Sequence, residues 1–265
     1  MLRPWRVGLL LLAIAAVLAA NHWRYWWGPA YQQHMLLTPC PDDPGVDPFT
    51  VKGDAAGLCA YRADNQRRIA AGERPELVLF GDSILGDWQM VQPGLFGANW
   101  VNRGIGGQDS TQLLARFRQD VIALRPRVVL IEAGTNDMIA RRGVIGPDDF
   151  RANLESLVDL AEVNGIVPVL ATVPPIARFP TRPRLDPAPL QTAINRHIRD
   201  LASKRGLVLA DFHAALAAAD GHSPRPELSL DGVHPTAEGY RMLEPVVRRA
   251  LEQAQAQAQA RQAPR

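Results

Sequence analysis

The sequence predicts an α/β fold, a three-layer α/β/α sandwich around a five-stranded parallel sheet. Five short runs rich in Val, Leu and Ile are typical of strands buried on both faces, and helical stretches lie between them. This alternation implies a parallel sheet with right-handed crossovers in one domain. The 265 residues, 47% hydrophobic and 21% charged, are enough to form a full core and argue against global disorder.

The expected elements follow one another regularly along the chain. The strands are expected at Glu76–Phe80, Trp100–Asn102, Arg127–Ala133, Ile166–Val173 and Leu207–Asp211. The helices are expected at Leu58–Ala71, Ser110–Leu124, Pro147–Asn164, Pro187–Arg205 and from Pro235 to about Ala250. Residues 28–56, rich in proline, are expected to form an irregular linker. The Gln-Ala repeat of residues 252–265 is expected to extend the last helix.

The first 20 residues have the pattern of an export signal. Arg3 and Arg6 precede Val7–Ala20, a run without charge or proline. The small residues at its end suit a signal peptidase, whereas the aromatic residues that follow suit a membrane anchor. The run is shorter than the roughly 20 residues that a membrane span needs. We expect an exported protein, periplasmic or secreted, with this segment either cleaved or retained as an anchor.

The cysteines and the charges limit the possible partners. Cys40 and Cys59 are the only cysteines, and an oxidising compartment would allow them to form a disulfide worth about 3 kcal/mol. Two unrelated buried thiols are the alternative. Apart from Arg3 and Arg6, acidic and basic residues are equal in number, so a nucleic-acid partner has no electrostatic basis. No CxxC or HExxH spacing indicates a metal.

In this architecture ligands bind beyond the carboxyl ends of the strands, and four segments there carry candidate chemistry. The first is Gly81-Asp82-Ser83-Ile84. Its serine, on a tight turn after a glycine where the backbone must bend, is placed like a nucleophile. The alternative is an ordinary helix cap.

The second and third segments offer hydrogen-bond donors. The run Asn102–Gln108 contains three glycines, but Asp109 replaces the third glycine of a dinucleotide-binding GxGxxG motif. A glycine here brings a bare N–H up to a reacting oxygen. Asn136, in Gly-Thr-Asn-Asp after the third strand, can donate its amide N–H into the same crevice, or it can close an Asx turn.

The fourth segment supplies a candidate base. Asp231 precedes His234 by three residues in a turn that ends at Pro235, so the carboxylate can hold one imidazole nitrogen while the other faces outward. The remaining histidines lack this pattern in a comparable loop; they are His22, His34, His197, His213 and His222. Asp82 and Asp137 are expected to stabilise turns, because no carboxylate spacing indicates glycosidase chemistry.

Together the four segments resemble the SGNH hydrolases, also called the GDSL esterase and lipase family, over about Glu76 to Leu251. Ile84 replaces the leucine of GDSL. The resemblance implies an SGNH/flavodoxin-like fold without a cofactor and a catalytic triad of Ser83, Asp231 and His234. It also implies an oxyanion hole formed by the N–H groups of Ser83 and Gly107 and by the Asn136 amide, although Gly106 adjoins Gly107.

The segment patterns and the resemblance together suggest a domain division. A signal peptide or anchor at 1–20 and a linker with a helix at 21–72 would precede an SGNH hydrolase domain at 73–251 and a tail at 252–265. The oligomeric state is not predicted.

The expected function is a serine esterase that hydrolyses carboxylic esters, short-chain or acetyl, through an acyl-enzyme, on an envelope carbohydrate or related molecule. A polar rim supports this expectation; its arginines are Arg141, Arg142, Arg178, Arg182 and Arg184. Three alternatives stay open: a lysophospholipase or thioesterase-like hydrolase, an envelope O-acyltransferase, and a non-catalytic glycan-binding module.

Overall fold

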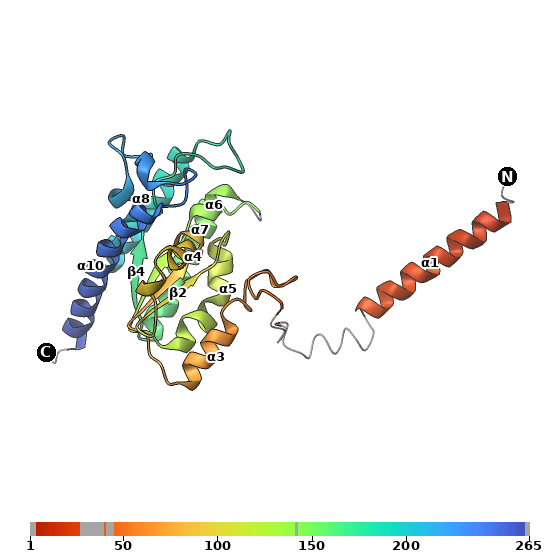
Figure 1. Ribbon diagram of the computed structural model, residues 1–265, viewed down its shortest axis with the longest axis horizontal. Helices are drawn as coiled ribbons and strands as arrows, with labels where there is room; N and C mark the ends of the chain where they lie inside the picture. The colour runs from red at the N-terminus through yellow and green to blue at the C-terminus, as the bar shows by residue number, and fades with distance from the viewer. Residues whose placement is uncertain (1–3, 27–39, 41–44, 141–142, 263–265) are drawn as a thin grey trace. The chain divides into compact units, whose positions relative to one another are not determined.

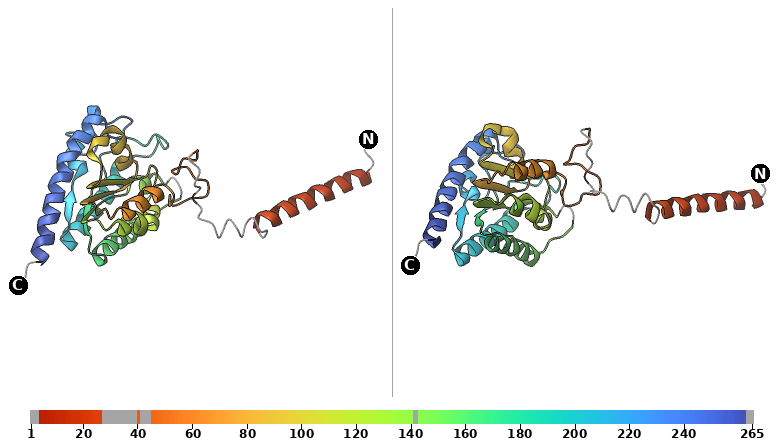
Figure 2. Two further views of the ribbon diagram at one scale, coloured as in Figure 1. Left: turned by 60° about the horizontal axis from the view of Figure 1, so that its bottom comes forward. Right: turned by 90° about the horizontal axis from the view of Figure 1, so that it is seen from below.

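The computed structural model describes residues 4–26, 40, 45–140 and 143–262. The chain divides into two compact units, Met1–Asp54 and Ala55–Arg265. The second unit contains the whole sheet, with helices on both of its faces (Figures 1 and 2). The predicted α/β/α sandwich with a five-stranded parallel sheet is thus confirmed.

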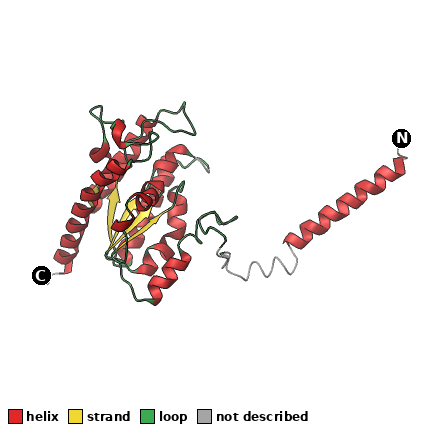
Figure 3. Ribbon diagram, in the orientation of Figure 1, coloured by secondary structure: helices red, strands yellow, loops and turns green. Residues whose placement is uncertain are grey.

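The sheet has the strand order β2-β1-β3-β4-β5, and all neighbouring strands are parallel. The strands are β1 (Leu77–Gly81), β2 (Trp100–Gly104), β3 (Val128–Glu132), β4 (Val167–Ala171) and β5 (Val208–Ala210). Each overlaps its predicted run, with ends shifted by at most two residues; β1 and β2 continue one and two residues beyond the predicted ends. Every residue of β1, β2 and β3 is buried, as expected for parallel strands covered by helices on both faces (Figure 3).

Helices connect the strands. In the second unit they are α3 (Arg62–Ala70), α4 (Ser83–Val91), α5 (Ser110–Asp120), α6 (Thr135–Ile139), α7 (Pro147–Val163), α8 (Pro187–Arg205), α9 (Phe212–Leu216) and α10 (Ala237–Gln262), with 3-10 turns at Pro93–Leu95, Ile122–Leu124 and Pro226–Leu228. The α8 bounds match the prediction, and α10 extends into the Gln-Ala tail as expected. The sequence missed α4, α6 and α9, because they are short, with nine, five and five residues, and too few apolar positions recur in them to reveal a helical period.

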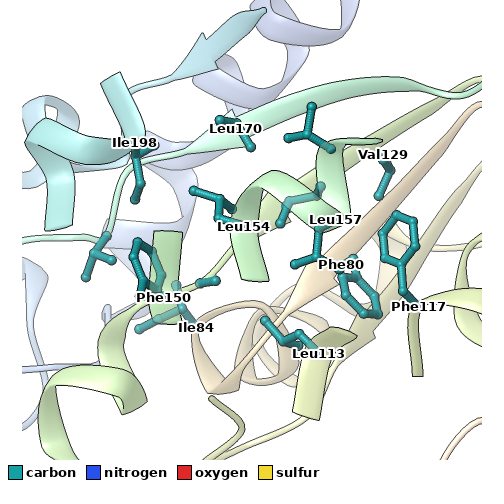
Figure 4. Close-up of a cluster of buried hydrophobic side chains, with 14 of the residues drawn as sticks. Phe80, Ile84, Leu113, Phe117, Val129, Phe150, Leu154, Leu157, Leu170 and Ile198 are labelled. Atoms are coloured by element: carbon teal, nitrogen blue, oxygen red, sulfur yellow. The ribbon is translucent and has the colours of Figure 1, made fainter. Parts of the chain in front are cut away.

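The two faces of the sheet pack against different helices. Alternate side chains of β1 point to opposite faces, so that Phe80 belongs to one core cluster and Leu79 to the other. The Phe80 ring meets Phe117 of α5 edge-on at 5.2 Å between centroids, within the cluster drawn in Figure 4. On the other face, Trp88 of α4 stacks on Tyr240 of α10. Burying each such aromatic side chain stabilises the fold by about 1.5–3 kcal/mol.

The first unit contains α1 (Pro4–Trp26). Its leucines from Leu9 to Leu12 are exposed. Among the described residues, no helix combines the length and hydropathy that crossing a bilayer requires. The export segment at 1–20 stays a prediction, and most of the expected linker lies outside the described residues. Cys40 and Cys59 are both disulfide-bonded.

Candidate active site

The turn between β1 and α4 presents Ser83 at the carboxyl edge of the sheet. Asp82 is the N-cap of α4, and its carboxylate accepts the N–H of Ile84 at 2.9 Å, so the expected turn-stabilising role of Asp82 is confirmed. Glycine is required at position 81 because a side chain would not fit there, and not because of the backbone bend that the sequence suggested. A Cβ there would lie 2.6 Å from the Glu132 carbonyl oxygen on β3, and no side chain fits that gap.

A hydrogen-bonded chain of three side chains runs from this turn to the loop before α10. Ser83 Oγ lies 3.0 Å from His234 Nε2, and His234 Nδ1 lies 2.9 Å from Asp231 Oδ2. With the Nδ1 proton donated to the carboxylate, the Nε2 lone pair faces the serine hydroxyl. The structure therefore brings together the three residues predicted for the triad, from positions 151 residues apart.

The Asp231 carboxylate is prepared to stay ionised. Its Oδ1 accepts the N–H groups of Val233 and His234, both at 2.9 Å. Burial opposes ionisation, but these bonds together with His234 outweigh it and hold the pKa of Asp231 below its usual value. An anion at this position stabilises the imidazolium that forms when His234 takes a proton.

Residues after β4 form hydrogen bonds with residues 231–235, the loop that carries His234 and is called the histidine loop below. Arg178 Nε donates to the carbonyl of Asp231 at 3.1 Å, and Ala177 N–H donates to the carbonyl of Gly232 at 2.8 Å. Arg182 reaches across to the Ala140 carbonyl at the end of α6, at 3.1 Å. Arg178 was predicted only as a rim residue, and the structure shows it bonded to the Asp231 carbonyl in the histidine loop. Arg141 and Arg142 lie outside the described residues.

The glycine pair after β2 lies beside the serine. A Cβ on Gly106 would stand 3.7 Å from the Ser83 Cβ, and Gly107 has φ of 77°, a conformation that glycine adopts without strain. The third predicted donor is engaged within the protein: Asn136 Nδ2 donates to Asp82 Oδ2 and to the carbonyl of Gln108, both at 3.0 Å. Both of its amide hydrogens therefore have acceptors, a pattern that the sequence did not reveal.

Two further carboxyl groups lie under the turns. Glu132 and Asp82 are both fully buried; burial first, and then the Asp82 charge, raise the pKa of Glu132 well above its usual value. Asp137 accepts the Ser110 hydroxyl at 2.5 Å and the Ser110 N–H at 3.1 Å, joining α6 to α5 as expected of a turn-stabilising group. Burial raises the pKa of Asp137 to about 6.

Asp109, which replaces the third glycine of the dinucleotide-binding motif, has a structural role. Asp109 caps α5, accepting the N–H groups of Thr111 and Gln112 at 3.1 Å, and Gln112 completes a capping box.

Across residues 4–26, 40, 45–140 and 143–262, no group of three His, Cys, Asp or Glu side chains is arranged to hold a metal ion.

Comparison with known proteins places this geometry in a family. Residues 69–242 match the model of the GDSL-like lipase/acylhydrolase family. The chain belongs to that family. A GDSL-like lipase from Bacteroides thetaiotaomicron has a solved structure that is 33% identical, with a TM-score of 0.69, and the match covers 75% of this chain and 98% of that one.

Two curated relatives add detail. An acetylxylan esterase from Geobacillus stearothermophilus is 28% identical over 172 residues, which is 60% of this chain and 74% of the relative. An uncharacterized lipoprotein from Bacillus subtilis is 34% identical over 79 residues, 29% of this chain and only 32% of that relative. The family and the esterase relative together make this acylhydrolase a hydrolase of carboxylic esters.

Proposed function

We propose that this acylhydrolase is a serine esterase that removes short acyl groups, above all acetyl, from a carbohydrate through an acyl-enzyme. The observation that carries the proposal is the unbroken chain from Asp231 through His234 to Ser83, with both links at hydrogen-bond distance. An activated hydroxyl of this kind attacks ester carbonyls.

The reaction takes place in two halves. His234 Nε2 accepts the Ser83 proton as Oγ bonds to the ester carbonyl carbon, and Asp231 stabilises the imidazolium. His234 then gives that proton to the departing alkoxide, the C–O bond breaks and the alcohol leaves. Water adds to the acyl-enzyme with His234 again as base, and the carboxylic acid is released as Ser83 regains its proton.

The tetrahedral intermediate carries a negative oxygen that needs donors. In the proposal, Ser83 N–H and Gly107 N–H meet it together with the Asn136 amide. An oxyanion is a stronger acceptor than a peptide carbonyl, so it competes with Gln108 for one Asn136 hydrogen once it forms. Asn136 then bonds more strongly to the transition state than to the substrate, which is the condition for catalysis.

The substrate class rests on two independent supports. The Geobacillus relative is described as an acetylxylan esterase. The loop after β4 exposes Arg178 beside the histidine loop, and guanidinium groups donate hydrogen bonds in a planar fork that suits acidic or hydroxyl-rich sugars. An acetylated glycan is consistent with both the esterase relative and the exposed Arg178.

A longer acyl chain is the second candidate, because an apolar cavity adjoins the helix that carries Asn136. It has a volume of about 580 Å³ and is lined by Met138, Ile145, Phe150 and Ile194, among others. Medium-chain esters would be the better substrates if this cavity received the acyl group, as a lysophospholipase or thioesterase-like activity requires.

Export completes the proposal. The charged and then apolar start of residues 1–20 fits an export signal, disulfide-bonded cysteines persist in oxidising compartments, and one relative is described as a lipoprotein. Thiol titration of the denatured protein from the bacterial envelope should find no free cysteine, and two titratable thiols would contradict the disulfide. The mass of the mature N-terminus distinguishes a cleaved signal from a retained anchor.

The decisive experiment is a substrate series with a serine control. Ser83→Ala should abolish hydrolysis of p-nitrophenyl acetate and of acetylated xylo-oligosaccharides without changing thermal unfolding. Ser156→Ala removes an exposed hydroxyl on α7 that bonds only its own helix, and it should retain full activity. Turnover by Ser83→Ala would reject the nucleophile. A p-nitrophenyl series from acetate to decanoate separates the two substrate candidates, and product analysis with and without an unacetylated glycan, whose free hydroxyls can accept the acyl group, reveals acyl transfer.

A further inference from the structure

Gln108, the residue after Gly107, uses all of its side-chain polar groups in buried contacts. It is 3% exposed. Its Oε1 accepts Arg116 Nε at 2.5 Å, its Nε2 donates to the carbonyl of Ala56 at 2.9 Å, and its backbone carbonyl accepts the Asn136 amide at 3.0 Å. One residue thus joins the glycine turn, the Asn136 side chain, helix α5 and the segment before α3.

Arg116 connects this residue to the serine turn. The side chain is fully buried on α5. Besides Gln108, it donates to the carbonyl of Gly81 at 2.9 Å and to Asp120 at 2.9 Å, and its guanidinium lies 4.3 Å from the centre of the Phe80 ring. Gly81 is the last residue of β1, two before Ser83. A single planar cation therefore fixes the backbone ahead of the nucleophile and the residue after Gly107.

The segment before α3 closes this arrangement from the other side. Gly57 approaches so closely that a Cβ on it would stand 2.7 Å from Gln108 Nε2, and its φ of +70° suits only glycine without strain. Tyr61 donates its hydroxyl to the carbonyl of Gly104, at the end of β2, at 2.6 Å. These contacts come from residues that precede the family match at 69–242.

We propose that Gln108 and Arg116 are positioning residues that set the separation of the oxyanion donors, with the segment Ala56–Tyr61 holding Gln108 in place. This rests on the proposed function, in which Ser83, Gly107 and Asn136 supply those donors. Arg116 acts on the Ser83 side through Gly81, and Gln108 acts on Gly107 by adjacency and on Asn136 through its carbonyl. Neither side chain touches the substrate.

The physical reason is the narrow tolerance of such a pocket. Donors stabilise the transition state only when they lie about 2.7–3.1 Å from the oxyanion, and a misplacement of about 1 Å can reduce the rate by about 10²-fold. Backbone N–H groups in a glycine turn have no side chains of their own to fix them. The buried hydrogen bonds of the next residue supply that constraint.

The test compares two glutamines that are tied to the same upstream segment. Gln108→Met removes the bonds to Arg116 and Ala56. Gln119→Met on α5 removes a bond of the same length, 2.9 Å from Nε2 to the Leu58 carbonyl, that does not reach the glycine turn. Each variant of the full chain is assayed for kcat and KM with p-nitrophenyl acetate, for inhibition by an alkylboronic acid that forms a tetrahedral adduct with serine, and for thermal unfolding.

We expect Gln108→Met to reduce kcat by about 10- to 100-fold with KM within about twofold, and to weaken boronate binding by a similar factor. Gln119→Met should keep wild-type kcat and boronate affinity, and its loss of thermal stability should be smaller because it removes a single part-buried bond. Gln108→Glu, which can still accept from Arg116, should recover part of the kcat lost in Gln108→Met. Equal kcat losses in the two methionine variants, or wild-type kcat in Gln108→Met, would overturn the positioning role. Absence of Ser83-dependent hydrolysis in the wild type would instead reject the proposed function itself.

Discussion

The two halves of the candidate site are built in opposite ways. The nucleophile half, with Asp82, Gln108 and Asn136, is buried, and those three side chains are at most 6% exposed. The histidine half is open, since the side chains of His234 and Asp231 are 29% and 39% exposed. The first is fixed by the ends of β1, β2 and β3, whereas the second is a loop held by a few surface hydrogen bonds.

This difference shows where activity and stability are coupled. In the buried half, a substitution that removes a partner leaves another polar group unsatisfied, which costs about 1–3 kcal/mol. In the open half, water replaces the lost partner. We therefore expect changes in the histidine half to reduce activity alone, and changes to the buried side chains of the nucleophile half, which do not include that of Ser83, to reduce both activity and stability.

Asp231→Asn should have the largest effect. The amide cannot hold the imidazole in the required tautomer or stabilise its charge, so kcat should fall by about 10⁴-fold while thermal unfolding stays near the wild type. Asp220→Asn is the matched control, because the Asp220 carboxylate also accepts two N–H groups in an exposed loop, from His222 and Ser223 at 2.9 Å, away from Ser83. A near-wild-type rate in Asp231→Asn would remove this residue from the triad.

Asn136→Ala should reduce both kcat and the free energy of unfolding. The loss of one oxyanion donor lowers kcat by about 10²–10³-fold, and the loss of donors to Asp82 and to the Gln108 carbonyl should lower the unfolding free energy by about 1–3 kcal/mol. Asn164→Ala removes an exposed amide that bonds only to Leu160 and should change neither. Unchanged kcat in Asn136→Ala, measured beside its urea unfolding curve, would exclude Asn136 from the oxyanion hole.

Arg178→Ala should have a moderate effect on activity. It removes one exposed hydrogen bond to the Asp231 carbonyl. Stability should stay near the wild type because water replaces the lost partner, whereas kcat should fall by about fivefold because the loop that carries His234 is held less precisely. Arg182→Ala, on the same loop but bonded to Ala140, should leave kcat unchanged. If the two variants behave alike, the loop after β4 does not position the histidine loop through Arg178.

Asp137→Asn tests the buried half without touching the reaction. Because burial raises the folded pKa of Asp137 to about 6 from 3.8, the protein binds more protons than the unfolded chain between those values. The stabilisation that Asp137 contributes to the folded protein is fully present below about pH 4 and is lost as the pH rises through about 6.

The size of that loss follows from the shift of about two pKa units, which corresponds to about 3 kcal/mol. We expect the unfolding free energy of the wild type, measured with urea from pH 4 to 8, to fall more steeply than that of Asp137→Asn. Parallel curves would show that Asp137 does not titrate in this range.

The sequence revealed the side chains that are proposed to react, but little of what holds them in place. Ser83, Asp231, His234 and Asn136 stand in short motifs after strands, and strands are recognisable from local apolar runs. Gln108, Arg116 and Arg178 carried no such local signal, because their roles depend on partners far away in the chain. One sign was available: Arg116 and Asp120 are charged residues four apart in α5, on the same side as Leu113 and Phe117, where exposed charges would not be expected.

Gly81 and Asn136 show the same dependence on partners that are distant in the sequence. A tight turn explains why a small residue precedes Asp82, but only the distance of 2.6 Å from a Gly81 Cβ to the Glu132 carbonyl shows that space is the reason. Likewise, the Asn136 side chain was recognised as a donor, while its two acceptors, Asp82 and the Gln108 carbonyl, come from two other loops.

The sequence by itself determined the order of the five strands along the chain, the sheet edge at which the candidate site lies and the side chains that are proposed to react. These depend on local composition and on the geometry that all parallel sheets share. Only the tertiary structure decided the distances between Ser83, His234 and Asp231, the buried bonds of Gln108 and Arg116, and the exposure of the histidine loop. Hydrogen bonds depend on separations of a few tenths of an ångström between segments distant in sequence, and packing alone fixes those separations.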